Sequence, residues 1–216
     1  MDFAVFIKYL PVLAEGAIMT VELTVLAIIV GTALGLFIAL AEISHSRVVS
    51  SAARFYTWLV RGTPLLLQLF TIYYGLPQIG LTLSPFVAAV TGMSLNSAAY
   101  VAEIIRGAIE SIDKGQMEAA RSLGMSYLQA MRRIILPQAY RRLIPPMGNE
   151  FIALLKDSSL VATISMVDLM RTAQQMYATT FRPVEIFAGA GCLYLLLTTF
   201  FTITFGRLEK RLSVYQ

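Results

Sequence analysis

The hydrophobic residues of this chain are gathered into long runs that short polar connections separate. The runs cover residues 17–41, 55–76, 86–109, 143–170 and 186–205. A helix needs about 20 mostly apolar residues to cross the hydrocarbon core of a bilayer, and each run approaches or exceeds that length. The pattern therefore predicts an all-α polytopic membrane protein with about five transmembrane helices. We expect residues 1–216 to form a single domain.

Two of the runs contain small or helix-breaking residues that bear on how their helices pack or end. Gly31 and Gly35 stand four residues apart in the first run, a spacing that permits close contact with another helix, although glycine can also simply be tolerated there. The second run is interrupted at Gly62-Thr63-Pro64. Proline removes a backbone donor, and the loss must be compensated by protein or water inside a membrane. We read this site as a structural break, with an ordinary helix start as the alternative.

The connection from Asp113 to Pro137 is polar, although apolar runs lie on both sides of it. Asp113 can cap a first short helix, and Gly124 stands where a left-handed residue would end it. Ser126 can cap a second short helix, whose continuation Pro137 should disturb. On the first helix Met117, Ala120 and Gly124 share one face, which we interpret as a small, smooth surface that another protein can approach closely.

Three ordered motifs carry a family resemblance. Glu118-Ala119-Ala120, followed by Gly124 and then Ile135-Leu136-Pro137, resembles the EAA loop of ABC importer permeases of the type I transmembrane fold. The segments 61–68 (RGTPLLLQ) and 156–160 (KDSSL) resemble the branch that takes up polar amino acids. The resemblance implies a cytoplasmic coupling-helix loop at about 111–142; without it, the loop would be an ordinary amphipathic connection. The coupling residues it implies are Glu118, Ala119, Ala120, Arg121 and Gly124.

The resemblance also implies a set of partners. These are an ABC ATPase subunit dimer, a second permease copy or a similar permease, an extracellular solute-binding protein, an amino acid substrate and the lipid bilayer. The chain has no GxxxxGK[ST] loop, so we expect ATP and Mg to bind on the partner ATPase, with no cofactor and no enzyme activity in this chain. One histidine and one cysteine cannot supply a metal-ligand cluster. We expect no nucleic acid partner.

Composition and charge agree with a membrane protein and indicate its orientation. Only 14% of the residues are charged, against about 25% in soluble domains, so a soluble protein is excluded. Most lysines and arginines fall in segments 42–61, 111–142 and 207–216, whereas the opposite connections hold Lys8, Arg171 and Arg182. Positive charge marks the cytoplasmic side. We therefore expect the loop and the C-terminus in the cytoplasm and the N-terminus outside, in a bacterial inner membrane.

Ionisable and polar residues at membrane depth are the candidates for a transport pathway, because each charged group there costs a few kcal/mol. Asn96, Tyr100 and Glu103 recur at i, i+4 and i+7 and so share one helical face. The fourth run adds a second polar group, which consists of Asn149, Glu150, Lys156, Asp157, Ser158 and Ser159. A polar cavity at the middle of the membrane would explain all of them. The alternative is a structural ion pair of Lys156 with Asp157 or Glu103, or a position of Glu150 at the membrane interface.

The acidic candidates bear on the substrate. Glu103 and Asp157 suit an ammonium group or a cationic side chain, which favours basic amino acids such as arginine, lysine or histidine. The carboxylate could be bound by Asn96, Ser158 and Ser159. Lys156 weakens this reading unless Asp157 neutralises it, and specificity could also reside in the extracellular binding protein.

Two other classes of function remain open from the residues alone. A self-sufficient ion-coupled carrier or channel would use Glu103, Lys156 and Asp157 as a proton relay, but it gives no reason for the EAA-like loop. A membrane scaffold without transport would leave the charges inside the runs unexplained.

Overall fold

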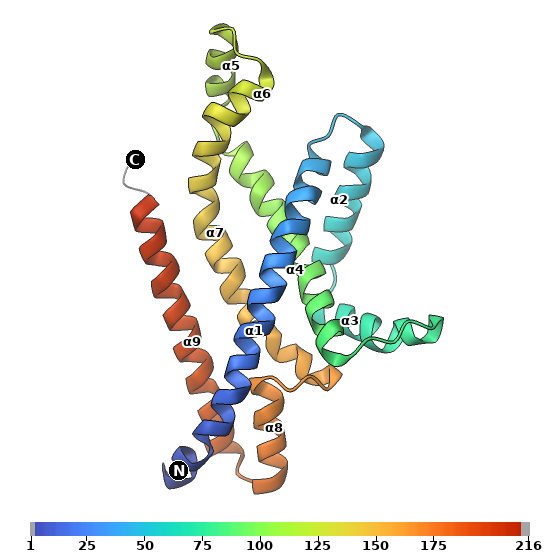
Figure 1. The fold of residues 1–216 in the computed structure, drawn as a ribbon, viewed down its shortest axis with the longest axis vertical. Helices are drawn as coiled ribbons and strands as arrows, with labels where there is room; N and C mark the ends of the chain where they lie inside the picture. Colours follow the sequence, from blue (N-terminus) through green and yellow to red (C-terminus); the bar gives the residue numbers. More distant parts are fainter. Residues whose placement is uncertain (1–2, 213–216) are drawn as a thin grey trace.

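The computed structural model describes residues 3–212, and these fold into helices joined by short turns. Four long helices run lengthwise through an elongated molecule: α1 (Phe3–Glu42), α4 (Pro85–Glu110), α7 (Leu136–Asp157) and α9 (Pro183–Leu212) (Figure 1). The short α-helices are α2 (Arg47–Arg61), α3 (Leu65–Phe70), α5 (Lys114–Ser122), α6 (Tyr127–Ala130) and α8 (Leu169–Thr180). The other turns are the π-helices η1 (Thr71–Gly75) and η3 (Met131–Ile135) and the 3-10 helices η2 (Leu76–Ile79) and η4 (Ser158–Ile164). The all-α class is confirmed.

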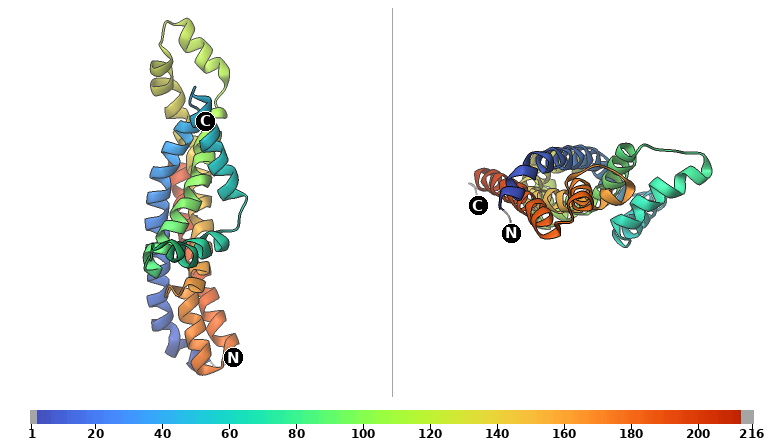
Figure 2. Two further views of the ribbon diagram at one scale, coloured as in Figure 1. Left: turned by 90° about the vertical axis from the view of Figure 1, so that its right-hand side faces the viewer. Right: turned by 90° about the horizontal axis from the view of Figure 1, so that it is seen from below.

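Within residues 3–212, two helices are long and apolar enough to cross a membrane. These segments are Lys8–Glu42 and Pro183–Arg211, with 35 and 29 residues. The α5–α6 loop lies at one end of the molecule, and the N-terminal end of α1 lies with α8 at the other (Figure 1). Figure 2 shows the same elongated bundle from the side and from below. The number of membrane crossings stays a prediction.

The second apolar run is not one straight helix, because the chain breaks where the sequence predicted. Helix α2 ends at Arg61, and α3 leaves sideways after Pro64 (Figure 1). The carbonyls freed by the break find donors within the same segment. Gln68 Nε2 donates to the carbonyls of Val60 at 2.8 Å and Thr63 at 3.2 Å. The break is therefore a stabilised turn rather than a simple helix start.

The prediction of one span over 143–170 is wrong. Helix α7 begins earlier, at Leu136, and ends at Asp157, where the chain tightens into η4. Ser158 Oγ donates to the carbonyl of Leu155 at 2.8 Å, a local bond that competes with regular helix. Ser165 then takes a left-handed conformation with φ 65°, which prevents the helix from continuing.

The loop after α4 forms the two predicted helices, and their caps are confirmed. Asp113 Oδ1 accepts from the Gly115 amide at 2.7 Å, and Gly124 ends α5 with φ 82°. Ser126 and Gln129 form a reciprocal capping box at the start of α6. The continuation of the second helix is disturbed before Pro137, as predicted, and the disturbance is a π-turn. The π-turn η3 lies directly before α7, and Pro137 occupies the first turn of α7, where a missing donor is tolerated.

Glycine lets α1 and α4 lie in close contact over their middle portions. An alanine methyl carbon at Gly31 would stand 2.9 Å from Ser97 Cβ, and one at Gly35 would stand 2.9 Å from both the Ala98 carbonyl oxygen and Val101 Cβ. No side-chain carbon fits at these distances, so the GxxxG interpretation of close helix contact is confirmed. The contact fixes the helix that carries Asn96 and Tyr100.

Candidate functional site

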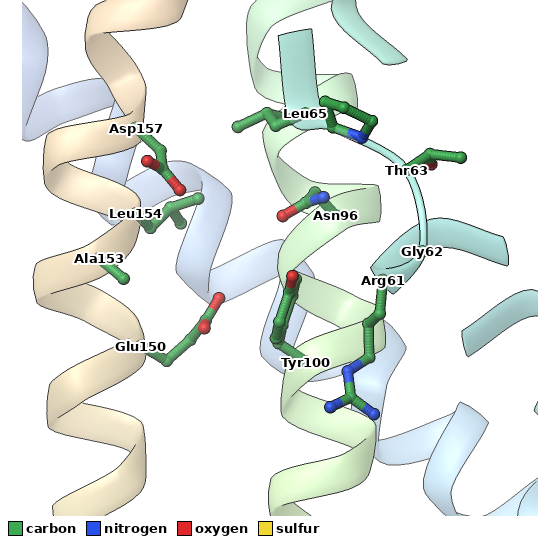
Figure 3. Close-up of a pocket in the computed structure, with 11 residues that line it drawn as sticks. Arg61, Gly62, Thr63, Leu65, Asn96, Tyr100, Glu150, Ala153, Leu154 and Asp157 are labelled. Atoms are coloured by element: carbon green, nitrogen blue, oxygen red, sulfur yellow. The ribbon is translucent and has the colours of Figure 1, made fainter. Parts of the chain in front are cut away.

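A cavity of about 430 Å³ opens between the α2–α3 turn, α4 and α7 (Figure 3). Its polar side chains come from three elements that are far apart in the sequence. They are Arg61 and Thr63 from the end of α2 and the turn after it, Asn96 and Tyr100 from α4, and Glu150 and Asp157 from α7. The 3.6-residue helical period explains the arrangement, because Asn96 and Tyr100 are one turn apart and Glu150 and Asp157 are two turns apart.

Hydrogen bonds hold several of these side chains in place. Asn96 Nδ2 donates to Gln68 Oε1 at 3.1 Å, which ties α4 to the segment after the helix break. Glu150 Oε1 accepts from Ser97 Oγ at 3.0 Å, which ties α7 to α4. The polar groups that face the cavity are therefore fixed by neighbours behind them, as a preorganised binding site requires.

Four of the residues predicted for the substrate pathway meet at this cavity: Asn96, Tyr100, Glu150 and Asp157. The structure places the other five outside its lining: Glu103, Asn149, Lys156, Ser158 and Ser159. Ser158 is buried, whereas Asn149 and Lys156 are exposed. Arg61 lies in the motif at 61–68 but was not among the residues predicted for the pathway.

Glu103 belongs to a network of charges at the border of the cavity. Its Oε2 accepts from Arg106 Nη2 at 2.6 Å and lies 3.4 Å from Arg61 Nη1. Arg106 also contacts Glu110 Oε2 at 2.7 Å and lies 3.6 Å from Glu42 Oε2. The alternative in which Glu103 is the partner of Lys156 is therefore wrong, because two arginines hold this carboxylate.

Glu42 is a member of this network that sequence reasoning missed. Its side chain is fully buried, and Thr57 Oγ1 donates to its Oε1 at 2.8 Å. The other carboxylate oxygen has no hydrogen-bond partner among the described residues and depends on Arg106. The sequence signal that could have indicated its role is a lone acidic residue directly after the apolar run 17–41. That position is also where a polar loop would begin.

The predicted coupling residues lie on the loop at one end of the molecule, beyond the ends of α1 and α2 (Figure 1). Glu118, Ala119, Arg121 and Gly124 are exposed, but Ala120 is only 1% exposed. Met117 packs on a cluster that includes Ile112 and Ile135. The interpretation that the small face is free for a partner is therefore wrong for Met117 and Ala120, which the loop uses to fold on its own chain, whereas Gly124 of that face stays open. The exposed surface of α5 lies on the other side.

A helical bundle with two helices long enough to cross a membrane and a polar cavity between its helices, within the part of the chain that the structure describes, fits the membrane component of a transport system. The family of the binding-protein-dependent transport system inner membrane component matches residues 31–214, and the chain belongs to this family. It is therefore a permease subunit rather than an enzyme, in agreement with the resemblance of the EAA-like loop.

Similar proteins match along nearly the whole chain. The arginine transport system permease protein ArtQ of Bacillus subtilis (strain 168) is 43% identical over 214 residues, which cover 99% of this chain and 98% of that protein. The glutamine transport system permease protein GlnP of Escherichia coli (strain K12) is 38% identical and covers 99% of this chain and 98% of its own length.

A solved structure described as an amino acid ABC transporter with histidines has a TM-score of 0.95 and 44% identity. The match covers 98% of this chain and 99% of that one. The MetNI methionine ABC transporter in an inward-facing conformation has a TM-score of 0.81 at 18% identity, a likeness of fold alone.

Proposed function

We propose that this chain is the membrane-spanning subunit of an ATP-driven importer of polar amino acids and that it prefers basic ones. The observation that carries the proposal is the charge of the cavity. Glu150 and Asp157 face it with negative charge, and Arg61 is the one cation among the lining residues that the structure describes. The lining therefore favours a substrate with net positive charge, which arginine, lysine and protonated histidine have. The name of the arginine permease among the relatives supports the same class.

The spacing of the two carboxylates suits an extended basic amino acid. Glu150 and Asp157 are seven residues apart on one helix, a rise of about 10 Å. A basic amino acid carries two positive groups, the α-ammonium and the side-chain cation, at opposite ends of a flexible chain. Each carboxylate can contact one of them. Lys156 does not line the cavity, although its charge acts on the neighbouring Asp157.

The proposal includes an orientation and a set of partners. The α5–α6 loop faces the cytoplasm of a bacterial cell and contacts one subunit of an ATPase dimer, which binds ATP and Mg. A second permease copy or a similar permease completes the pathway, and an extracellular solute-binding protein delivers the substrate. The N-terminus lies outside and the C-terminus inside; residues 213–216 of that basic tail lie outside the described residues. One permease domain, residues 1–216, carries all these contacts.

A self-sufficient carrier has less support. It needs Glu103, Lys156 and Asp157 to pass protons among themselves. The structure holds Glu103 between two arginines, and only Asp157 of the three lines the cavity.

The test is uptake into proteoliposomes that contain the permease, its ATPase and the binding protein. We expect ATP-dependent uptake of L-arginine, and we expect Glu150→Gln to reduce it by about tenfold, since a charged hydrogen-bond partner is lost. Uptake of a neutral amino acid that the assembly also carries should fall less. Glu22→Gln removes an exposed acid from α1 outside the cavity and should change neither. ATP-independent uptake, or an equal loss for cationic and neutral substrates, would contradict the proposal.

A further inference from the structure

Arg61 occupies a distinctive place in the cavity. It is the last residue of α2, directly before the turn at Gly62, and its side chain is 42% exposed. In Figure 3 its guanidinium lies below Tyr100, and Asp157 lies at the other end of the cavity. Positive charge therefore gathers at one end of the cavity and negative charge along α7. This arrangement of charge is complementary to an amino acid with a cationic side chain, which has one carboxylate and two positive groups.

Two arginines share Glu103, and they hold it unequally. Arg106 Nη2 contacts Glu103 Oε2 at 2.6 Å with hydrogen-bond geometry, whereas Arg61 Nη1 lies 3.4 Å from the same oxygen in a looser ion pair. The shorter charge-assisted contact is the stronger one. Of the two arginines, Arg61 is thus the one that can leave at lower cost.

Arg106 is anchored independently of Arg61. It contacts Glu110 at 2.7 Å, and the buried carboxylate of Glu42 lies 3.6 Å from its Nε. Because the Glu42 oxygen has no other partner among the described residues, moving Arg106 would strand a buried charge. Arg106 therefore stays in place and keeps Glu103 neutralised if Arg61 turns away.

Arg61 also keeps donors available. A guanidinium has five N–H groups arranged in a fork, and this one is held by the long contact to Glu103 and by the ring of Tyr100, 5.4 Å from its centre. The fork matches the two oxygens of a carboxylate. The Tyr100 ring stabilises the cation without using its N–H groups.

From these contacts we propose that Arg61 binds the α-carboxylate of the transported amino acid and exchanges Glu103 for it when substrate enters. The inference rests on the proposed function, since it assumes a basic amino acid in this cavity. Glu150 and Asp157 contact the positive groups of the substrate, and Arg61 contacts its carboxylate. The cavity then selects amino acids over the corresponding amines, a discrimination that the two carboxylates alone do not provide.

The experiment measures equilibrium binding to the purified permease–ATPase complex in nanodiscs, without the binding protein. The ligands are L-arginine, L-arginine methyl ester and agmatine, which is arginine without its carboxylate. We expect L-arginine to bind wild type about 10- to 100-fold more tightly than either analogue, the range for one charge-assisted contact. Arg61→Gln should weaken the binding of L-arginine by about that factor and the binding of agmatine by less than about threefold.

Matched variants separate recognition from folding. Arg54→Gln removes an exposed arginine from the same helix outside the cavity and should leave all three affinities unchanged. Arg61→Lys keeps the charge without the fork and should retain part of the preference for L-arginine. The wild-type comparison of L-arginine with its methyl ester requires no variant, so a poorly folding Arg61→Gln protein does not block the test.

The outcomes distinguish the two proposals. If wild type binds L-arginine but binds the ester and agmatine equally well, Arg61 does not read the carboxylate and this inference is overturned, while the proposed function stands. An equal loss of L-arginine and agmatine binding in Arg61→Gln overturns it as well. If wild type binds none of the three ligands but binds a neutral amino acid, the preference for basic substrates is what fails.

Discussion

The contact between α1 and α4 can be tested by adding a single methyl group. Replacing Gly35 with alanine places a carbon 2.9 Å from the Ala98 carbonyl oxygen and from Val101 Cβ. Packed atoms prefer about 3.5–4.0 Å, so the two helices must separate by roughly half an ångström or more. Overpacking of this kind costs about 1–3 kcal/mol, whereas alanine gains about 1 kcal/mol over glycine in helix propensity.

A second glycine cancels the propensity term. Gly191 in α9 has no atom within 4 Å of the position that a new methyl would occupy. Gly191→Ala should therefore be neutral or more stable by up to about 1 kcal/mol. The difference in unfolding free energy between Gly35→Ala and Gly191→Ala then isolates the clash, and we expect it to be about 1–3 kcal/mol.

The assay has a stability arm and a transport arm. Unfolding of the purified protein is followed in detergent mixtures, and uptake is measured in proteoliposomes. Gly35 packs on Ala98 and Val101 of α4. Asn96 and Tyr100, which line the cavity, belong to the same part of α4, so a displaced α4 also shifts the cavity wall. We expect Gly35→Ala to lower uptake more than Gly191→Ala does. Equal stability and equal uptake of the two variants would refute the argument that close contact positions the site.

Two further predictions concern the ends of the molecule. Gly124 and Gly80 both have positive φ, 82° and 87°, with no atom near a new methyl, so isoleucine imposes the same backbone strain at each. We expect Gly124→Ile to abolish co-purification with the ATPase and Gly80→Ile to preserve it. If the ATPase co-purifies with both variants, the assignment of the coupling loop is wrong. In a Cys192→Ser background, we expect Gln116→Cys to be labelled only from the cytoplasm and Gln78→Cys only from outside, and the reverse pattern would overturn the orientation.

The sequence by itself determined the all-α class, the approximate places of most long helices and several helix ends. Asp113, Gly124 and Ser126 set helix boundaries through bonds to residues within three positions of themselves, so a linear reading could find them. The break at Gly62–Pro64 was predicted for the same reason. The disturbance before Pro137 was predicted as well, but not its form as a π-turn, and 143–170 was read as one span because hydropathy does not register the local bond of Ser158.

Only the tertiary structure decided which charges meet. Asn96, Tyr100, Glu150 and Asp157 could be selected from their helical spacing, because the period places them on one face of each helix. The pairing of Glu103 with Arg61 could not, since Arg61 reaches it from a different helix, whereas Arg106 lies three residues away on α4 at a spacing that the sequence shows. Helix spacing gives the direction of a side chain, but the attraction between two charges depends on a distance that the packing of α2 and α4 sets.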